Sequence, residues 1–465
     1  MAVVIGVFAY IALQFAIGIW VSRRIRDEKD YILGGRQLGV TLASFSVFAT
    51  WFGAETVIGS SGRVYQQGLS GAQGEPFAYA VGIVIMGLFF AVPLWRRGIV
   101  TFGDFFRDRF SPGVEKLTIV LLVPGSVLWA AAQIRGFGQV MSATSTLDLR
   151  LAMTIAAAVV IAYTVFGGLL ADVYTDFVQG IAIIVGLLAI LLAVIVQTEN
   201  PATLLASVDT VRLQPMRPDQ SLLEFIEQWA IPICGSLVAV ELISRILACR
   251  SPEVARRATP LGGGLYLVVA LIPVYLGFIG PNLVPVLDEP EQLSMELAKT
   301  YLPTILYVMF AGALISAILS TVDSALLASA SLVSHNIYLR LRPNLSERDK
   351  VKAARFGVAG LGILAYLLAL RSSGISDLVE TASAFASAGI FVALAFGLFT
   401  SFGGPASASA AIAAGALVWA AGKFVLDVPT PYLAGLLAAV AAYIAVALVE
   451  RRKVGPTGRV RSPIG

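Results

Sequence analysis

The chain has 465 residues, of which 57% are hydrophobic and 13% are charged. A soluble domain carries about 25% charged residues, so the composition excludes an ordinary soluble protein and indicates a polytopic protein of the lipid bilayer. The formal net charge of +4 is explained by basic residues beside membrane helices, and we expect no nucleic-acid partner.

Apolar runs of roughly 20 residues, the length that crosses a bilayer as a helix, recur along the chain. They predict an all-α polytopic membrane protein with about 13 transmembrane helices in a single domain, residues 1–465. The first run has no basic segment before it and no small-residue cleavage site, so we interpret it as a retained helix. The predicted spans are residues 2–21, 40–60, 76–95, 117–145, 151–169, 173–196, 224–247, 261–282, 304–338, 355–371, 376–399, 405–425 and 430–449.

Lys and Arg residues crowd into alternate connections between these spans, while the other connections are poorer in them and carry acids. Because cytoplasmic connections are enriched in Lys and Arg, we expect the amino terminus outside and the carboxy terminus in the cytoplasm, which requires an odd number of spans. The expected location is a plasma membrane, such as a bacterial inner membrane. The basic connections lie at residues 23–36, 96–116, 250–257, 340–355 and 451–453.

The second and seventh spans are interrupted by residues that weaken a helix. Gly53 and Glu55 lie near the middle of the second span, and Pro232 and Gly235, followed by Glu241, lie in the seventh. Ordinary kinks are one explanation. The other is that spans 2–6 and 7–11 are two five-helix inverted repeats, each with a broken first helix whose freed carbonyls can coordinate a cation. The core would then comprise residues 39–400, with 1–38 and 401–465 as peripheral helices and a cytoplasmic tail.

The ninth span carries hydroxyls and a carboxylate within one and a half helical turns. Ala317, Ser320, Thr321 and Ser324 share one face by the i, i+3, i+4, i+7 rule, and Asp323 lies among them in the sequence. Oxygen ligands without His or Cys suit a hard cation, and an ionisable group at membrane depth indicates a functional site. Tighter helix packing is the alternative role for small hydroxyl residues. We predict a sodium site in this span.

Three motifs resemble the sodium/solute symporter family and keep the order and spacing of that family. They are DYILGGRQLG at residues 30–39, YTVFGGL at 163–169 followed by TDFVQ at 175–179, and STVDS at 320–324 in a segment that ends with NIY at 336–338. The similarity covers about residues 30 to 400. It implies a LeuT-type fold with ten core helices in two inverted repeats, and uphill solute uptake coupled to the entry of Na⁺.

The sodium site of this family maps by position onto the second and ninth spans. The resemblance implies that Ala49, Phe52 and Ala317 supply carbonyl oxygens, and that Ser320 and Thr321 supply hydroxyls. Five neutral oxygens would bind Na⁺ weakly enough to release it inside the cell.

A second sodium site, present in some members of the family, maps onto Asp176 and Ser324. Asp323 stands where such members have Ser, so this site is expected either to be strengthened or to become protonatable. The alternative for Asp176 is an acid at the start of a helix, stabilised by the helix dipole.

The candidate substrate-binding residues lie at mid-membrane depth. Three of them are carboxylates, Glu55, Glu75 and Glu241, against one deep cation, Arg135. Because an unpaired buried charge is costly, this excess favours a solute with a positive group, such as a quaternary amine or an amino acid. We expect Arg135 to pair with Glu55 or Glu241. The remaining candidates are polar or aromatic: Trp51, Thr56, Gln73, Tyr79, Trp129 and Gln133.

Parts of the second, fourth and ninth spans are particularly similar to high-affinity choline transporters. In those relatives, tryptophans at the positions of Trp51 and Trp129 form part of an aromatic cage, which suits an ammonium group through cation–π contacts. This chain has Ala239 where a further cage tryptophan is expected. Galactose-transporting relatives have a glutamate at the position of Glu75 and an asparagine at that of Ala239, so a sugar or a carboxylate remains an alternative solute.

These features predict a sodium-coupled symporter that imports a small organic solute, cationic or zwitterionic, and that functions as a monomer. A proton-coupled variant that uses Asp323 is an alternative. A channel would show a continuous polar pore, and a membrane enzyme would need a catalytic constellation, which the sequence lacks. Cys234 and Cys249 show no metal-ligand spacing and are expected to be free thiols.

Overall fold

The structure is a computed structural model that describes residues 27–454, except 146, 199–207, 288, 343, 373 and 386, together with a few single residues before Asp27. Helices and short connections make up this part of the chain, which confirms the predicted all-α class. The first predicted span, residues 2–21, falls almost wholly outside the described residues. Cys234 and Cys249 are buried free thiols, as expected.

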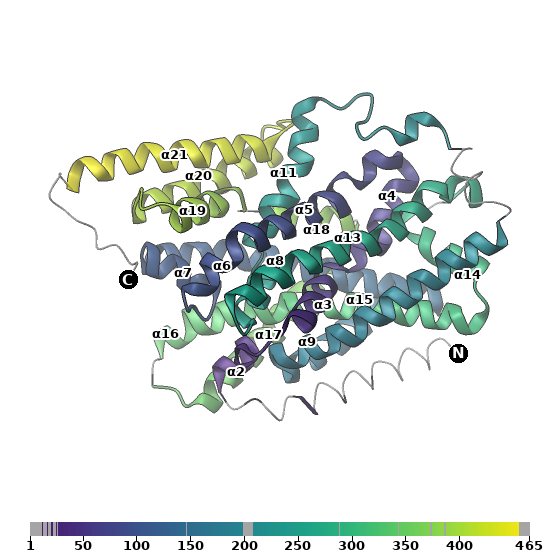
Figure 1. Cartoon of the computed structure of the whole chain (residues 1–465), viewed down its shortest axis with the longest axis horizontal. Helices are drawn as coiled ribbons and strands as arrows, with labels where there is room; N and C mark the ends of the chain where they lie inside the picture. The colour runs from purple at the N-terminus through teal and green to yellow at the C-terminus, as the bar shows by residue number, and fades with distance from the viewer. Residues whose placement is uncertain are drawn as a thin grey trace.

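The helices follow one another along the chain with short connections (Figure 1). Short 3₁₀ or π segments interrupt several of them, notably η2 (Glu55–Gly59), η4 (Gln73–Ala78), η5 (Met86–Phe90) and η8 (Leu332–Tyr338). The α-helices are α2 (Glu28–Leu33), α3 (Val40–Trp51), α4 (Ser60–Gln67), α5 (Tyr79–Ile85), α6 (Ala91–Arg96), α7 (Phe102–Arg109), α8 (Pro112–Thr144), α9 (Leu149–Gln197), α11 (Leu222–Val238), α12 (Val240–Ala248), α13 (Pro252–Leu283), α14 (Leu293–Tyr301), α15 (Thr304–Ser331), α16 (Leu339–Leu341), α17 (Glu347–Ala369), α18 (Ile375–Ala384), α19 (Ser387–Phe399), α20 (Pro405–Phe424) and α21 (Pro431–Val454).

Among the described residues, nine helices are long and apolar enough to cross a membrane, or ten if the bent pair α11 and α12 counts as one span. Each predicted span from the second to the last falls on such a helix or on shorter apolar pieces, but the total of 13 stays a prediction. The fifth and sixth predicted spans both lie in α9, which has 49 residues and is interrupted at Gly168. Gly168 kinks this helix with a positive φ of 68°, a conformation that glycine adopts without a steric penalty.

The second predicted span is broken at the expected place. Helix α3 ends at Trp51, and Phe52 leaves the helical conformation with φ −88° and ψ 70°. The chain then passes Gly53 and resumes as η2 at Glu55. A Cβ atom at position 53 would lie 2.6 Å from a Gln133 oxygen, so any residue other than glycine would require this side chain of α8 to shift.

The seventh predicted span is also broken, but not where the sequence indicated. Pro232 and Gly235 both lie inside α11, and the bend of 43° falls between α11 and α12 at Ala239. A Cβ atom at position 235 would lie 3.1 Å from the Ser383 carbonyl oxygen. Gly235 therefore allows a close helix contact with α18, and the prediction of a break at Pro232 and Gly235 was wrong in position.

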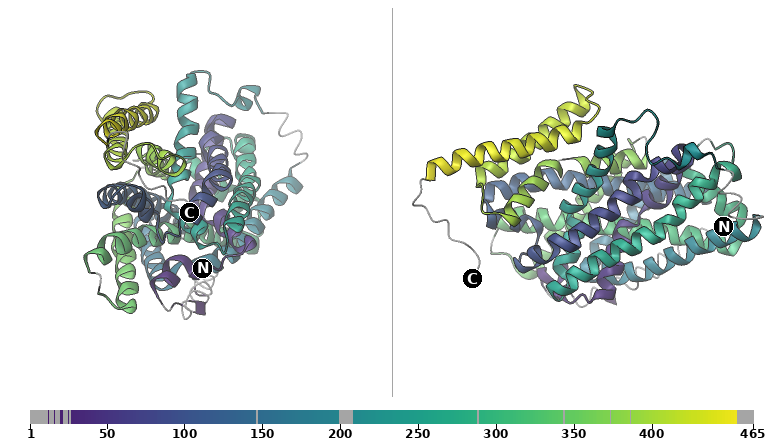
Figure 2. Two further views of the ribbon diagram at one scale, coloured as in Figure 1. Left: turned by 60° about the vertical axis from the view of Figure 1, so that its left-hand side comes forward. Right: turned by 45° about the horizontal axis from the view of Figure 1, so that its top comes forward.

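The long helices run roughly along one direction in an elongated bundle (Figure 2). Helix α15 packs against α8, α9 and α17, and α3 packs against α9 and α13. Every residue of α15 from Ala313 to Ser331 is buried, so the polar part of α15 is enclosed by other helices. Helices α20 and α21 pack together at one edge of the bundle (Figure 1).

Candidate functional site

The break after α3 faces the polar part of α15. The Thr321 hydroxyl lies 3.4 Å from the Ala49 carbonyl oxygen and 3.3 Å from that of Ala317. A Cβ atom at Gly53 would come within 2.9 Å of the same hydroxyl. Phe52, the residue before Gly53, is fully buried. The structure thus brings Thr321 together with two of the three predicted carbonyl donors, at the point where α3 stops.

Ser320 is the neighbour of Thr321, but its hydroxyl is oriented toward a different group. It donates a short hydrogen bond to Oδ1 of Asp176 on α9. Ser46 of α3 donates to Oδ2 of the same carboxylate at 2.5 Å. Asp176 is completely buried and therefore joins α3, α9 and α15 beside the predicted sodium site.

A buried arginine that sequence reasoning missed lies next to this carboxylate. Arg245 of α12 is 1% exposed and donates to Asp172 of α9 and to Ser324 of α15 through Nη2. The same nitrogen lies 3.6 Å from Oδ2 of Asp176. Among the described residues, Arg245 is the one fully buried cation. An arginine inside the apolar span 224–247 was the signal that could have indicated it.

The predicted second sodium site is brought together only in part. Asp176 and Ser324 both lie at Arg245, whereas Oδ1 of Asp323 accepts a short hydrogen bond from Thr164 of α9. Ser324 also donates to Oδ2 of Asp172 at 3.3 Å. The two acids Asp176 and Asp323 therefore accept hydrogen bonds from different side chains. Asp172, and not Asp323, lies with Asp176 beside Arg245.

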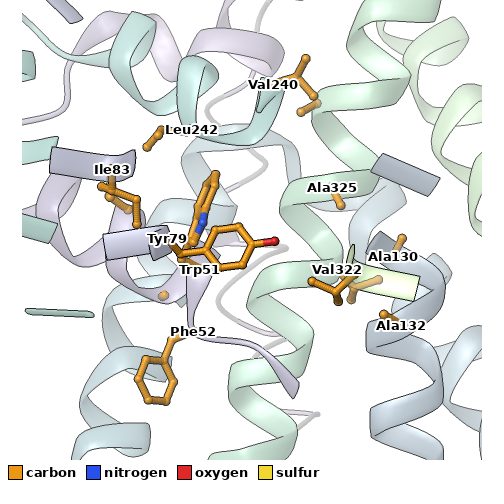
Figure 3. Packing of buried hydrophobic residues seen from close by; sticks show 14 of the residues in the cluster. Trp51, Phe52, Tyr79, Ile83, Ala130, Ala132, Val240, Leu242, Val322 and Ala325 are labelled. Atoms are coloured by element: carbon orange, nitrogen blue, oxygen red, sulfur yellow. The ribbon is translucent and has the colours of Figure 1, made fainter. Parts of the chain in front are cut away.

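The rings of Trp51, Tyr79 and Trp129 form an aromatic cluster near the α3 break. The ring centroids of Trp51 and Trp129 are 5.7 Å apart, and those of Tyr79 and Trp129 are 5.9 Å apart. Figure 3 shows Trp51 and Tyr79 projecting into the space that α15 borders through Val322 and Ala325. Among the described residues, neither indole nitrogen has a hydrogen-bond partner although both are buried. A buried N–H group without a partner is costly, and these two are available to a ligand.

The three predicted carboxylates are buried, and each accepts a hydrogen bond from a neighbouring side chain. Gln133 donates to Glu55 at 2.6 Å, and Ser126 donates to Glu241 at 2.6 Å. Glu75 accepts from Thr56 at 2.7 Å and from Tyr266, a residue that the sequence did not indicate.

Among the residues that the structure describes, no ion pair joins Arg135 to Glu55 or Glu241, so the predicted pairing is not found there. Arg135 is half-buried and donates to the Ser372 carbonyl at 2.8 Å. The idea of one deep cation, Arg135, was therefore wrong, because Arg245 is the more deeply buried of the two. Gln73 donates a short hydrogen bond to the Pro215 carbonyl oxygen and a longer one, of 3.4 Å, to Gln220.

One void lies between the two halves of the site, and in this conformation it is too small to hold a water molecule. It is lined by Thr50, Trp51, Trp129, Glu241, Thr321 and Ala325. The tryptophan pair, one carboxylate and the hydroxyl at the α3 break thus face a common space, while Glu55, Glu75, Thr56, Gln73 and Gln133 do not line it.

A larger cavity, which is open to solvent, reaches Glu75 and Tyr79 from one end of the bundle. Its charged lining residues are four acids and two arginines: Glu75, Glu224, Glu227, Glu380, Arg63 and Arg217.

A bundle of apolar helices with two broken spans around buried polar groups is typical of membrane transporters. The profile of the sodium:solute symporter family matches residues 31–415, so the chain belongs to that family, as its motifs predicted. The chain is 27% identical to a high-affinity choline transporter of Drosophila melanogaster over 81% of its own length and 63% of the relative's. It is 27% identical to the human high-affinity choline transporter, over 80% of its own length and 68% of the relative's. It is 26% identical to the osmoregulated proline transporter OpuE of Bacillus subtilis, over 81% and 80% of the two chains.

Two solved structures share the fold at low sequence identity. A Na⁺-coupled sialic acid symporter in a substrate-bound outward-open state matches with a TM-score of 0.84 and 18% identity, over 97% of this chain and 98% of that one. The nucleobase-cation-symport-1 family transporter Mhp1 in a closed conformation matches with a TM-score of 0.64 and 17% identity, over 93% and 96% of the two chains. The fold is therefore LeuT-like, as predicted.

Proposed function

We propose that this chain is a sodium-coupled symporter that imports a small organic solute with a positively charged amine group. The observation that carries the proposal is the shared cavity in which Trp51, Trp129 and Glu241 face Thr321. Once the helices around this void move apart to admit a solute, the solute and an ion at the α3 break would each contact the surroundings of the other, and such contact is the physical basis of coupled binding.

The proposed ligands of Na⁺ are the carbonyl oxygens of Ala49, Phe52 and Ala317 and the hydroxyls of Ser320 and Thr321. Oxygen ligands suit a hard cation. An ion in this position would tie α3 to α15 and would stabilise one arrangement of these helices over the other. Release of Na⁺ into the cytoplasm, where it is scarce, would then weaken the contact and let the solute leave.

The chemistry of the cavity supports a cationic or zwitterionic solute. The two indole faces can attract an ammonium group, and the Glu241 carboxylate supplies an opposite charge in a buried place, where such a charge acts strongly. Ala239 lines a neighbouring cavity with Trp129 and Glu241, and its small side chain leaves room for the solute. The relatives named for choline and for proline, one cationic and one zwitterionic solute, agree with this class.

The larger cavity is the proposed route of entry from outside. The acids Asp209 and Asp219 lie in the connection before α11, and by the distribution of Lys and Arg this connection is extracellular. Four acids against two arginines in the cavity lining would attract a cation and repel an anion. On this proposal the protein lies in a plasma membrane with its carboxy terminus in the cytoplasm.

Uptake into proteoliposomes tests this function most economically. Labelled choline, betaine, proline, a basic amino acid, galactose and a dicarboxylate are offered with an inward sodium gradient and, as the control, with equal sodium on both sides. We expect accumulation of an amine or amino acid only with the gradient. A neutral sugar or a dicarboxylate as the best solute would contradict the proposed class of solute, and gradient-independent uptake would contradict coupling.

A further inference from the structure

The second sodium site of this family falls, in this chain, at the place where Arg245 is buried. Nη2 of Arg245 donates short hydrogen bonds to Asp172 and Ser324 and lies 3.6 Å from the Asp176 carboxylate. Nη1 donates to the Ser244 hydroxyl at 3.1 Å and to the Glu241 carbonyl at 3.4 Å. The guanidinium group therefore already occupies Ser324 and Oδ2 of Asp172, while the oxygens of Asp176 accept from Ser46 and Ser320 and pair with the guanidinium at longer range.

The balance of charges in this buried region also argues against a second ion beside Arg245. Asp172 and Asp176 are 4% and 0% exposed, and two ionised acids in such a place are costly unless positive charges balance them. Arg245 supplies one positive charge. The second can come from Na⁺ at the α3 break, because Ser320, a proposed ligand of that ion, donates directly to Asp176.

We propose that Arg245 is a tethered cation that takes the place of a second sodium ion, so that the protein binds one Na⁺ and not two. This inference rests on the proposed sodium coupling and assigns to Arg245 the control of its stoichiometry. The guanidinium cannot leave with the solute, so the α9, α12 and α15 contact that it holds is kept through the cycle. Only the contact between α3 and α15 depends on the mobile ion.

Sodium binding to the full-length protein in detergent, measured with ²²Na⁺ at constant ionic strength in KCl, tests the inference without a solute. We expect the wild type to bind one Na⁺ per chain with a Hill coefficient near one. Arg245→Met keeps the length of the side chain and removes its charge, and it should bind a second Na⁺ with a Hill coefficient that approaches two. Arg245→Lys keeps the charge and should bind one. Arg342→Gln, which removes an exposed arginine, controls for a general effect of net charge.

A double variant checks the charge argument itself. Asp172→Asn combined with Arg245→Met removes one acid and one cation, so a single Na⁺ should again balance Asp176. If Arg245→Met does not fold, the wild-type stoichiometry still decides. Two Na⁺ bound to the wild type would overturn the inference and leave sodium coupling intact, whereas no Na⁺ bound at all would overturn the proposed function together with it.

Discussion

Thr321 lies on the polar face of α15 and contacts the chain near the point where α3 is broken. Its hydroxyl lies within 3.4 Å of two carbonyl oxygens from two helices, and its place on that face was readable from the spacing of small and hydroxyl residues. The orientation of Ser320 was not readable, because it depends on Asp176, which lies 144 positions away in the sequence. Periodicity identifies which residues share a face, but it does not identify the partner that the face meets.

Thr321→Ala is expected to lower the apparent affinity for Na⁺ at least tenfold, about 1.4 kcal/mol, because one ligand is lost from a narrow buried site. The measurement is sodium-dependent thermal stabilisation of the purified protein. Ser329→Ala is the matched control, since Ser329 is a buried serine of the same helix that donates to the Ala325 and Leu326 carbonyls of its own helix. Equal sodium dependence in Thr321→Ala and the wild type would remove the site from consideration.

Glu241→Gln tests the charge of the solute. The change keeps a group of the same shape beside Ser126 but removes the negative charge of the shared cavity. Binding of the best amine or amino-acid solute is expected to weaken at least tenfold, about 1.4 kcal/mol, in equilibrium binding at saturating Na⁺. Glu296→Gln on α14 serves as a control for the loss of one acid outside the site. Unchanged solute affinity in Glu241→Gln would show that the carboxylate does not face the solute.

Among the helices, the two broken spans position the residues of the site, and each span is interrupted for a different reason. Gly53 follows the end of α3 where its backbone touches Gln133 and Thr321, and its presence in an apolar run signalled the break. The second break falls at Ala239, which has no such signal in its own side chain. Pro232 and Gly235 are tolerated inside α11 because neighbouring helices pack closely on them. The rule that Gly and Pro interrupt helices therefore predicted the position of the first break correctly and that of the second break wrongly.

The short helix α7 lies between membrane helices and is tied to them by Asp104. This carboxylate accepts hydrogen bonds from Asn336 at 2.9 Å and from Arg340 at 3.2 Å, and it lies 3.5 Å from Nε2 of His335. Burial alone would raise the pKa of Asp104, but hydrogen bonds from His335 and from the backbone of Thr101 outweigh it and lower this pKa to about 2. A depressed pKa means that the ionised acid stabilises the folded state above its ordinary pKa and that this stabilisation is lost as the pH falls toward 2.

Asp104→Asn is therefore expected to lower the free energy of unfolding at neutral pH by about 1–3 kcal/mol, because three side chains and the backbone N–H groups of Val100 and Thr101 lose a charged partner. The difference from the wild type should shrink as the pH is lowered from 5 toward 3. Thermal unfolding in detergent across this range provides the measurement, with Asp108→Asn, an exposed acid of the same helix, as the control. A difference that grows on acidification would contradict this account of Asp104.

At the scale of the whole molecule, composition and apolar runs were sufficient for the class and nearly all of the helices. The family was readable from three short motifs, and the profile match confirms it. The exact number of spans was not readable, since only a kink at Gly168 separates two predicted spans in α9, and η2, α4 and the helices up to α6 follow one another with short connections. The polar network of Asp172, Asp176 and Arg245 was missed because its members come from separate helices and meet only in the folded bundle.

The central claim is that a sodium gradient drives net movement of the solute. Proteoliposomes are preloaded with the labelled solute selected by the uptake panel, the membrane potential is clamped at zero, and sodium gradients of equal size are imposed inward or outward. The account predicts that net solute flux follows the sodium gradient and reverses with it, and that Thr321→Ala loses most of this response while Ser329→Ala keeps it. Solute that equilibrates at the same rate under both gradients, or that follows an imposed proton gradient instead, would contradict the account.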